Sequence, residues 1–557
     1  MVRRVLGLVY KEVAGLHQAA YVLAIFAVGS QLLALIRDRI LASEFGAGAT
    51  LDIYYAAFRV PDLLFVLFAS SLSVYVLLPF VTRHQATADA NRARALLGQI
   101  MTLFLASYTV LAAVVALAAP WLMQMLFPHI VDQSLLVTVM RILLLQPVFL
   151  GLSSLCGVVT QYHNRFVLHA ISPLVYNIGI IFGIVALYPL LGLSGVAFGV
   201  VLGALGHVAV QWPLIRGSTL SFRPQRYFNW SELYDVLTTS VPRAITLSLN
   251  QVTLLVLVSL ASAMAVGSVA VFQFAFNLQS VPLAIIGVSY SVAAFPTLAK
   301  LYAGNELEQF QQHIVTALRH IIFWLVPIIA LCIVLRAQLV RVILGAGAFN
   351  WEDTRLTAAV FALLIISLVA HGINLLLLRA LYAGGDTKTP FLVSLGTTLA
   401  TVALALWIHS VYLAHSAFQT LVADALRVSD VAGTEVVVLA VAYTAGIWLQ
   451  LACFALVAHY RYAIAWREPL RVTAHALLAG FVGALVAYLA LNFFVAGLNV
   501  DTFLGIFLQG LLAGLLGCAG VVGTYALLGS AELSETTASL SRRIFKTDIV
   551  ATQKHVL

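Results

Sequence analysis

Residues Phe166–Leu214 read FVLHAISPLVYNIGIIFGIVALYPLLGLSGVAFGVVLGALGHVAVQWPL and contain no acidic residue, lysine or arginine. A helix that crosses the hydrocarbon core of a bilayer needs about 20 mostly apolar residues. The stretch holds two windows of this kind, Phe166–Leu187 and Leu191–Leu214, and similar windows recur along nearly the whole chain. The sequence therefore predicts a protein whose helices are surrounded by lipid.

The composition supports this interpretation. Of the 557 residues, 62% are hydrophobic and only 9% are charged, which is too little charge for the surface of a water-soluble domain. Because backbone groups inside lipid must satisfy their own hydrogen bonds, long apolar windows indicate helices and not the short alternating strands of a barrel. We expect an all-α polytopic membrane protein with about 14 transmembrane helices. The other predicted spans are Ala19–Ile36, Pro61–Phe80, Leu97–Ala119, Leu135–Gly157, Leu237–Ala261, Val269–Phe295, Ile321–Leu335, Leu356–Leu378, Phe391–Val411, Val436–Val457, Val472–Phe493 and Phe503–Leu528.

The distribution of positive charge indicates the orientation. Most of the 30 Lys and Arg residues fall before the first span, in the even-numbered breaks or after the last span. Because cytoplasmic segments carry the excess of Lys and Arg, we expect a multi-pass protein of the bacterial cytoplasmic (inner) membrane with both termini in the cytoplasm. The net charge of +8 fits contact with anionic membrane lipids and requires no nucleic-acid partner.

An internal repeat predicts two halves. Pro173 and Gly179 of the fifth span have counterparts at the same offset in Pro390 and Gly396, at the eleventh span. Two such helices, six spans apart, point the same way, as in transporters built from parallel halves with the site between them. The predicted organisation is an interfacial segment at 1–18, an amino-terminal lobe at 19–215, a cytoplasmic linker at 216–232, a carboxy-terminal lobe at 233–460, an accessory helix pair at 461–530 and a cytoplasmic tail at 531–557.

Ionisable groups inside a membrane cost about 2.5–3.5 kcal/mol each, so each calls for an explanation. Arg243 follows Pro242 inside the seventh span, and Asn250 and Gln251 lie about two turns further along the helix. This helix would present a cation and two amides toward the protein interior. The alternative is that Arg243 extends to the headgroups at the cytoplasmic surface.

A second group of charges lies around the first two predicted spans. Arg37 and Asp38 end the first span, Arg59 and Asp62 flank the start of the second, and Asp52 lies between them. They are either part of a binding site or interfacial charges at the outer rim of the membrane.

The sequence contains no motif of an enzyme. There is no HExxH zinc motif, no nucleotide-binding P-loop and no Gly-x-Ser-x-Gly sequence, and the four cysteines are far apart. We therefore expect no catalytic residue, metal site or cofactor. Without an ATP site, the membrane potential or an ion gradient remains as the driving force for any transport.

A series of short strings follows in order from about residue 29 to 390. The strings are Gly29-Ser30, Arg37-Asp38-Arg39, Phe45-Gly46-Ala47-Gly48, Asp52, Ala57-Phe58-Arg59-Val60-Pro61-Asp62, Pro79-Phe80, Gly195 to Gly206, Pro242-Arg243, Gly287-Val288 to Phe295-Pro296, Gly347-Ala348-Phe349 before Asp353-Thr354, and Arg379 to Ala383 with Asp386 to Pro390. In type and order they resemble the MurJ/MviN family, the lipid II flippases of peptidoglycan synthesis. The resemblance implies the multidrug/oligosaccharidyl-lipid/polysaccharide exporter (MOP superfamily) fold, in which two six-helix lobes form a V and two further helices follow.

The resemblance also implies a cationic central cavity, because lipid II carries a pyrophosphate that arginine side chains can bind bidentately. The substrate-binding candidates are Arg37, Asp38, Asp52, Arg59, Arg243, Asn250, Gln251 and Asn277. On this interpretation the arginines contact the pyrophosphate, and the acids orient them or couple transport to an ion.

The sequence departs from the family pattern at four places. Phe65-Val66 stands where a basic pair is usual, Ser70 where an acid is usual, Gln31 where Arg is common, and Asn277 where Arg is frequent. We therefore expect a less cationic cavity than is usual in the family.

The resulting hypothesis is a flippase that moves undecaprenyl-pyrophosphate-linked peptidoglycan precursor, lipid II, from the inner to the outer leaflet by alternating access. Partners would be membrane lipids and the cell-wall synthesis machinery. The alternatives are a flippase for another polyprenyl-linked glycan, a membrane glycosyltransferase or acyltransferase, and a non-transporting scaffold of cell-wall synthesis.

Overall fold

The computed structural model describes residues 16–69, 77, 90–163, 165–218, 220–494 and 502–545, and these residues form helices without any strand. Among them, 11 helices are long and apolar enough to cross a membrane, or 12 if Trp351–Ile365 and Leu368–Ala383, bent by 43°, count as one span. The predicted all-α membrane fold is confirmed.

The predicted count of about 14 spans is close to this number but is not confirmed. The predicted first span, Ala19–Ile36, lies within helix α2 (Leu16–Phe45), and the predicted second span runs past the end of α3 (Ala49–Ala69). Apart from Leu77, the remainder of that second span, with Ser70, lies outside the described residues. Most of the predicted interfacial segment 1–18 and the end of the tail beyond Phe545 also lie outside them.

Contacts divide the chain into two compact units, and the first comprises residues up to Val281, Ile343–Leu364 and Gly385–Gln450. After α2 and α3, its helices are α5 (Ala90–Leu126), α6 (Gln133–Leu143), α7 (Gln146–Tyr162), α8 (Phe166–Phe182), α9 (Tyr188–Leu191), α10 (Leu193–Ala209), α11 (Trp212–Gly217), α12 (Trp230–Ser262), α13 (Ser268–Pro282), α17 (Trp351–Ile365), α19 (Lys388–Ala414), α20 (Ser416–Leu426) and most of α21 (Val437–Tyr462). A π-helical turn, Gly183–Leu187, joins α8 to α9.

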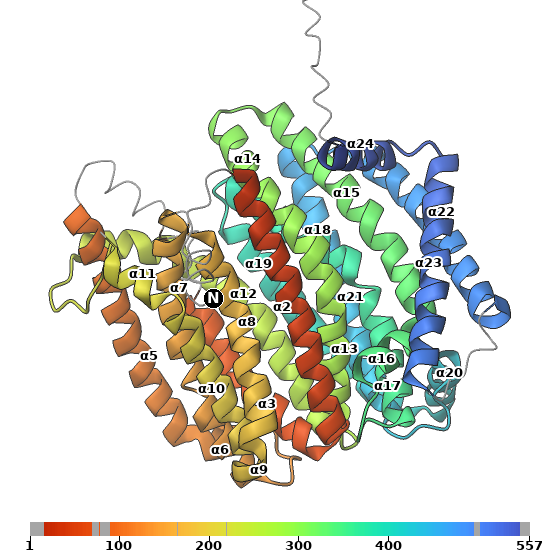
Figure 1. The fold of residues 1–557 in the computed structure, drawn as a ribbon, viewed down its shortest axis with the longest axis horizontal. Coiled ribbons are helices and arrows are strands. Elements are labelled where there is room, and N and C mark those ends of the chain that lie inside the picture. The colour runs from red at the N-terminus through yellow and green to blue at the C-terminus, as the bar shows by residue number, and fades with distance from the viewer. Residues whose placement is uncertain are drawn as a thin grey trace, which may run out of the picture. The chain divides into compact units, whose positions relative to one another are not determined.

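Glycines bring α8 and α10 of this unit together. A Cβ atom added at Gly179 would lie 2.3 Å from Cα of Gly203, and one added at Gly199 would lie 2.3 Å from Cα of Gly183. Lipid gives helices no hydrophobic drive to associate, so close packing of small residues is what holds such pairs together. On its other side α8 packs against α2, which runs alongside it (Figure 1), and this fixes Asn177 of α8 opposite Arg37 of α2.

The second unit comprises Pro282–Val342, Ile365–Gly384 and the chain from Leu451. Its helices are α14 (Ser289–Ala303), α15 (Leu307–Val334), α16 (Arg336–Leu344), α18 (Leu368–Ala383), α22 (Arg467–Leu489), α23 (Phe503–Leu527) and α24 (Ala531–Phe545). Helix α22 packs on both α15 and α23, and a Cβ atom at Gly483 would lie 2.9 Å from the Gly517 carbonyl oxygen. These glycines therefore allow α22 and α23 to approach closely. The lobe boundaries predicted from the sequence stay a prediction.

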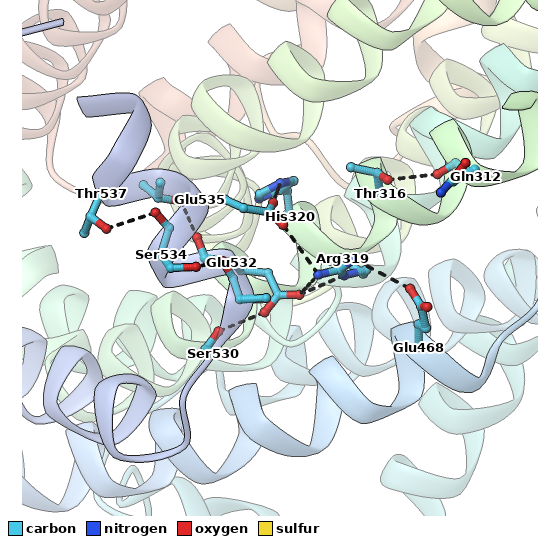
Figure 2. Close-up of polar contacts among 12 residues, drawn as sticks. Gln312, Thr316, Arg319, His320, Glu468, Ser530, Glu532, Ser534, Glu535 and Thr537 are labelled. Atoms are coloured by element: carbon cyan, nitrogen blue, oxygen red, sulfur yellow. Dashed lines mark hydrogen bonds and ion pairs between the residues drawn. The ribbon is translucent and has the colours of Figure 1, made fainter. Parts of the chain in front are cut away.

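Helix α24 belongs to the segment that the sequence classed as a tail, and it is docked on this unit by charge. Figure 2 shows Arg319 of α15 between Glu532 of α24 and Glu468 of α22. The Arg319 Nε donates to Glu532 Oε1 at 2.8 Å, its Nη2 lies 2.6 Å from the same oxygen, and Ser530 Oγ donates to the other oxygen at 2.8 Å. Burial opposes the charge on Glu532, but these bonds and its own backbone N–H outweigh it and hold the pKa of Glu532 below its usual value.

Candidate functional site

Helices α2, α3, α8 and α13 of the first unit line a cavity of about 130 Å³. It contains charged and amide side chains together with the hydroxyl groups of three tyrosines. These polar lining residues are Arg37, Arg59, Asp62, Gln273, Asn277, Tyr54, Tyr55 and Tyr176. Three of the predicted site residues, Arg37, Arg59 and Asn277, therefore line one cavity.

Arg37 is held by partners on its own helix and on α8. Its Nε and Nη2 donate to Oδ1 of Asp38 at 2.9 and 2.7 Å, and its Nη1 donates to Oδ1 of Asn177 at 3.0 Å. The second oxygen of Asp38 accepts a hydrogen bond of 3.0 Å from Nδ2 of Asn277 on α13. Asp38 thus connects the arginine of α2 to the amide of α13.

The network continues from Asn277 to the second arginine. Asn277 Oδ1 accepts from Gln273 Nε2 at 2.7 Å, and Gln273 Oε1 accepts from Arg59 Nη2 at 2.5 Å. Gln273 and Asn277 are four residues apart on α13, so they lie one above the other on the same helix face. We call the six connected residues Asn177, Arg37, Asp38, Asn277, Gln273 and Arg59 the arginine network; its hydrogen bonds run without interruption across four helices.

The charges of this region balance. Arg37 is paired with Asp38, and Arg59 interacts electrostatically with Asp62, three residues further along α3. Asp38 and Arg59 are only 3% and 6% exposed, so their charges would be very costly without these partners. The two guanidinium groups and two carboxylates together have no net formal charge. That the cavity is less cationic than is usual in the family stays a prediction.

Asp52, another predicted site residue, does not line the cavity. Its two carboxylate oxygens accept hydrogen bonds from the backbone N–H groups of Gly267 at 2.6 Å and Ala270 at 2.9 Å. These N–H groups lie at the start of α13, where a helix has unsatisfied donors and a partial positive charge. Asp52 therefore caps the helix that carries Gln273 and Asn277, and it sets their position.

The turn between α2 and α3 is clasped on both sides by glycines with positive φ. A Cβ atom at Gly267 (φ 92°) would lie 2.0 Å from the Ala47 carbonyl oxygen, and one at Gly347 (φ 53°) would lie 2.3 Å from the Ser43 carbonyl oxygen. The backbone N–H of Ala348 donates to that Ser43 oxygen at 2.8 Å. We call this contact between residues 43–48, Gly267 and residues 347–348 the glycine clasp; it fixes the ends of α2, α3 and α13.

The remaining candidates lie on α12 and are not brought to this cavity. Arg243 and Gln251 are half-buried and Asn250 is exposed, and none of the three lines the 130 Å³ cavity. Their role in binding stays a prediction.

Two members of the arginine network and one acid that lines the cavity were not chosen as candidates from the sequence. Asp62 was noted but not chosen, and Gln273 and Asn177 were not singled out. A signal existed for Gln273, because it precedes the candidate Asn277 by one helical turn within an apolar span. Asn177 carried no comparable signal, since its partner Arg37 is 140 residues away in the sequence.

Comparison with known proteins identifies the family of this chain. The family described as "Lipid II flippase MurJ" matches residues 41–508, which is most of the chain. The chain belongs to the MurJ family. This agrees with the resemblance seen in the sequence strings and places the chain among transporters and not among enzymes.

Individual MurJ relatives are distant but extensive matches. A probable lipid II flippase MurJ of Buchnera aphidicola is 26% identical over 380 residues, covering 66% of this chain and 74% of the relative. The lipid II flippase MurJ of Burkholderia cenocepacia is 25% identical over 396 residues, covering 69% of this chain and 77% of the relative.

Solved structures support the same fold. A lipid II flippase MurJ in an inward closed conformation matches with a TM-score of 0.69 at 20% identity, covering 91% of this chain and 99% of that one. An inward-facing multidrug resistance MATE family transporter of the MOP superfamily matches with a TM-score of 0.61 at 14% identity, covering 81% and 98%. The expected MOP superfamily fold is confirmed.

Proposed function

We propose that this MurJ family member flips lipid II from the inner to the outer leaflet of the bacterial cytoplasmic membrane by alternating access, without making or breaking a covalent bond. The observation that carries the proposal is the arginine network, in which the guanidinium groups of Arg37 on α2 and Arg59 on α3 line one cavity. A guanidinium can bind two oxygens of a phosphate at once, and lipid II carries a pyrophosphate.

The geometry supports a specific binding step. Arg37 uses Nε and Nη2, the edge that binds phosphate bidentately, to hold Asp38. A pyrophosphate that takes this edge must displace Asp38, which keeps its hydrogen bond from Asn277. In this proposal Asp38 holds Arg37 in place while the site is empty, and substrate competes with it for the guanidinium.

Alternating access then requires contacts around the α2 and α3 helices to break and re-form. The glycine clasp holds the α2–α3 turn through the hydrogen bond from Ala348 to Ser43. In our proposal this clasp breaks when the site faces the opposite leaflet, and the membrane potential or an ion gradient drives the cycle. Both termini lie in the cytoplasm, and the cell-wall synthesis machinery receives the flipped precursor.

A second candidate function is the flipping of another polyprenyl-linked glycan. The observation that favours it is the charge balance of Arg37 and Arg59 against Asp38 and Asp62, because a neutral site suits a headgroup with less negative charge. A scaffold without transport activity is the remaining alternative, and it predicts that the arginines are dispensable.

Complementation of cells depleted of their own lipid II flippase tests the proposal. We expect the native chain to restore growth and Arg37→Gln to fail, because the guanidinium edge is lost. Arg141→Gln is the matched control, since Arg141 is an exposed arginine of α6 that donates to the Ala116 carbonyl oxygen at 2.8 Å. Equal growth with Arg37→Gln and the native chain would contradict the assignment of the site, and failure of the native chain would favour the second candidate.

A further inference from the structure

A second cavity, of about 210 Å³, lies in the second unit between α15, the start of α22 and the start of α24. Its charged or titratable lining residues are Arg319, Glu468, Arg471, His475 and Glu532. The volume is sufficient for several water molecules or for one phosphate group. The cavity belongs to neither the arginine network nor the glycine clasp.

The carboxylates of this cavity are already engaged by protein. Arg319 lies 2.6 Å from Glu532 and 3.6 Å from Glu468, and Figure 2 shows it between the two. Because one guanidinium serves both acids, Arg319 has little capacity for a ligand. Any anion that enters the cavity must be bound by the other basic groups.

Arg471 and His475 are those groups. They are four residues apart on α22, so they lie one above the other on the face that lines the cavity. Neither forms a hydrogen bond or an ion pair with another residue in the part of the chain that the structure describes. A guanidinium and an imidazole N–H at this spacing can donate to different oxygens of one phosphate.

Exposed apolar side chains continue along α22 from Arg471. Leu478 and Leu485 are 47% and 45% exposed, and they follow Arg471 by seven and fourteen residues, which places them on the same side of the helix as this arginine. Helix α22 is part of the candidate span Arg467–Phe493, so this face meets lipid chains and the basic pair lies near the membrane surface. The site therefore presents cations where a lipid has its phosphate and an apolar face where it has its chains.

We propose that this cavity binds the phosphate of an anionic membrane phospholipid between Arg471 and His475, with an acyl chain along Leu478 and Leu485. A free phosphate ion shares the headgroup chemistry but makes no use of these apolar side chains. The lining also includes Ser530 and Glu532, so a bound lipid stabilises the docking of α24.

The test uses the full-length protein in an uncharged detergent, with lipid binding followed by native mass spectrometry and by thermal unfolding. The probes are phosphatidylglycerol, phosphatidylcholine and inorganic phosphate. The variants are His475→Gln and the double substitution Arg471→Gln with His475→Gln. Arg467→Gln is the matched control, because Arg467 is an exposed arginine at the start of α22 that does not line the cavity.

We expect phosphatidylglycerol to bind the native protein and Arg467→Gln equally, and the double variant about tenfold more weakly. Phosphatidylcholine and inorganic phosphate should bind poorly to all of them. Unchanged phosphatidylglycerol affinity in the double variant overturns the proposal. Inorganic phosphate binding as tightly as phosphatidylglycerol also overturns it, since the site would then take small anions. If the double variant does not fold, the single variant His475→Gln is used in its place. We expect it to lose less phosphatidylglycerol affinity than the double variant would, and an unchanged affinity would contradict the proposal.

Discussion

Replacing Asp38 with asparagine removes the carboxylate at the centre of the arginine network. Asp38 is 3% exposed and accepts two hydrogen bonds from Arg37 and one from Asn277. Removing one member of a buried ion pair costs about 3–5 kcal/mol, because the partner charge is left without compensation. The Arg37 side chain is 20% exposed and keeps its bond to Asn177, so we expect the low end of that range, about 3 kcal/mol.

A double-mutant cycle separates this effect from general damage. Arg37→Gln leaves the Asp38 carboxylate uncompensated and should cost a similar amount, about 3 kcal/mol. Because the two side chains interact directly, the double variant should also lose about 3 kcal/mol of unfolding free energy, and not the sum of the two single losses. The difference between that sum and the double loss is the coupling energy, about 3 kcal/mol, at the upper end of measured values. The free energy of unfolding is measured by SDS titration in mixed micelles. A double variant as destabilised as the sum of the single variants would refute the pairing.

The other predictions concern the helix cap, the glycine clasp and the docked α24 helix. Asp52→Ala should lower the free energy of unfolding by about 1 kcal/mol, measured in the same titration, because it leaves two N–H groups of α13 without an acceptor. Gly347→Ala should loosen the clasp, since a Cβ atom there lies 2.3 Å from the Ser43 carbonyl oxygen, and faster hydrogen exchange at residues 43–48 would show it. The pKa of Glu532 is depressed, so its contribution to the docking of α24 should be complete above its ordinary pKa of 4.5 and be lost as the pH falls through the lower pKa of the folded state. Protease sensitivity of α24 between pH 7 and pH 3 measures this, and Glu532→Gln should make α24 sensitive at neutral pH with little further change on acidification.

The membrane helices were the part most accessible from the sequence, because hydropathy alone specifies them. The predicted span Phe166–Leu187 coincides with α8 and the π-helical turn that follows, and Phe391–Val411 lies within α19, Lys388–Ala414. The docking of the predicted tail segment 531–557 on the rest of the protein could not be predicted from the sequence. Only the structure shows that Glu532 near its start is a buried partner of Arg319, since that contact joins residues 213 positions apart.

Several residues of the candidate site could be identified from the sequence, but the hydrogen bonds that connect them could not. Arg37, Arg59 and Asn277 were identified by charge, motif and position, and they do line one cavity. Their linkage through Asp38 and Gln273 depends on how α2, α3 and α13 face one another, which periodicity does not specify. For the same reason Asp52 was expected beside the substrate, whereas its carboxylate caps α13 through the N–H of Gly267, which lies 215 residues later in the sequence.

Translocation of fluorescent lipid II in reconstituted vesicles shows whether Arg37 and Arg59 are needed for transport. The vesicles contain the native chain, the combined variant Arg37→Gln with Arg59→Gln, or the control Arg141→Gln. We expect rapid transfer for the native chain and the control, and transfer at the rate of protein-free vesicles for the combined variant. If the folded combined variant transfers lipid II at the native rate, the guanidinium groups do not hold the pyrophosphate.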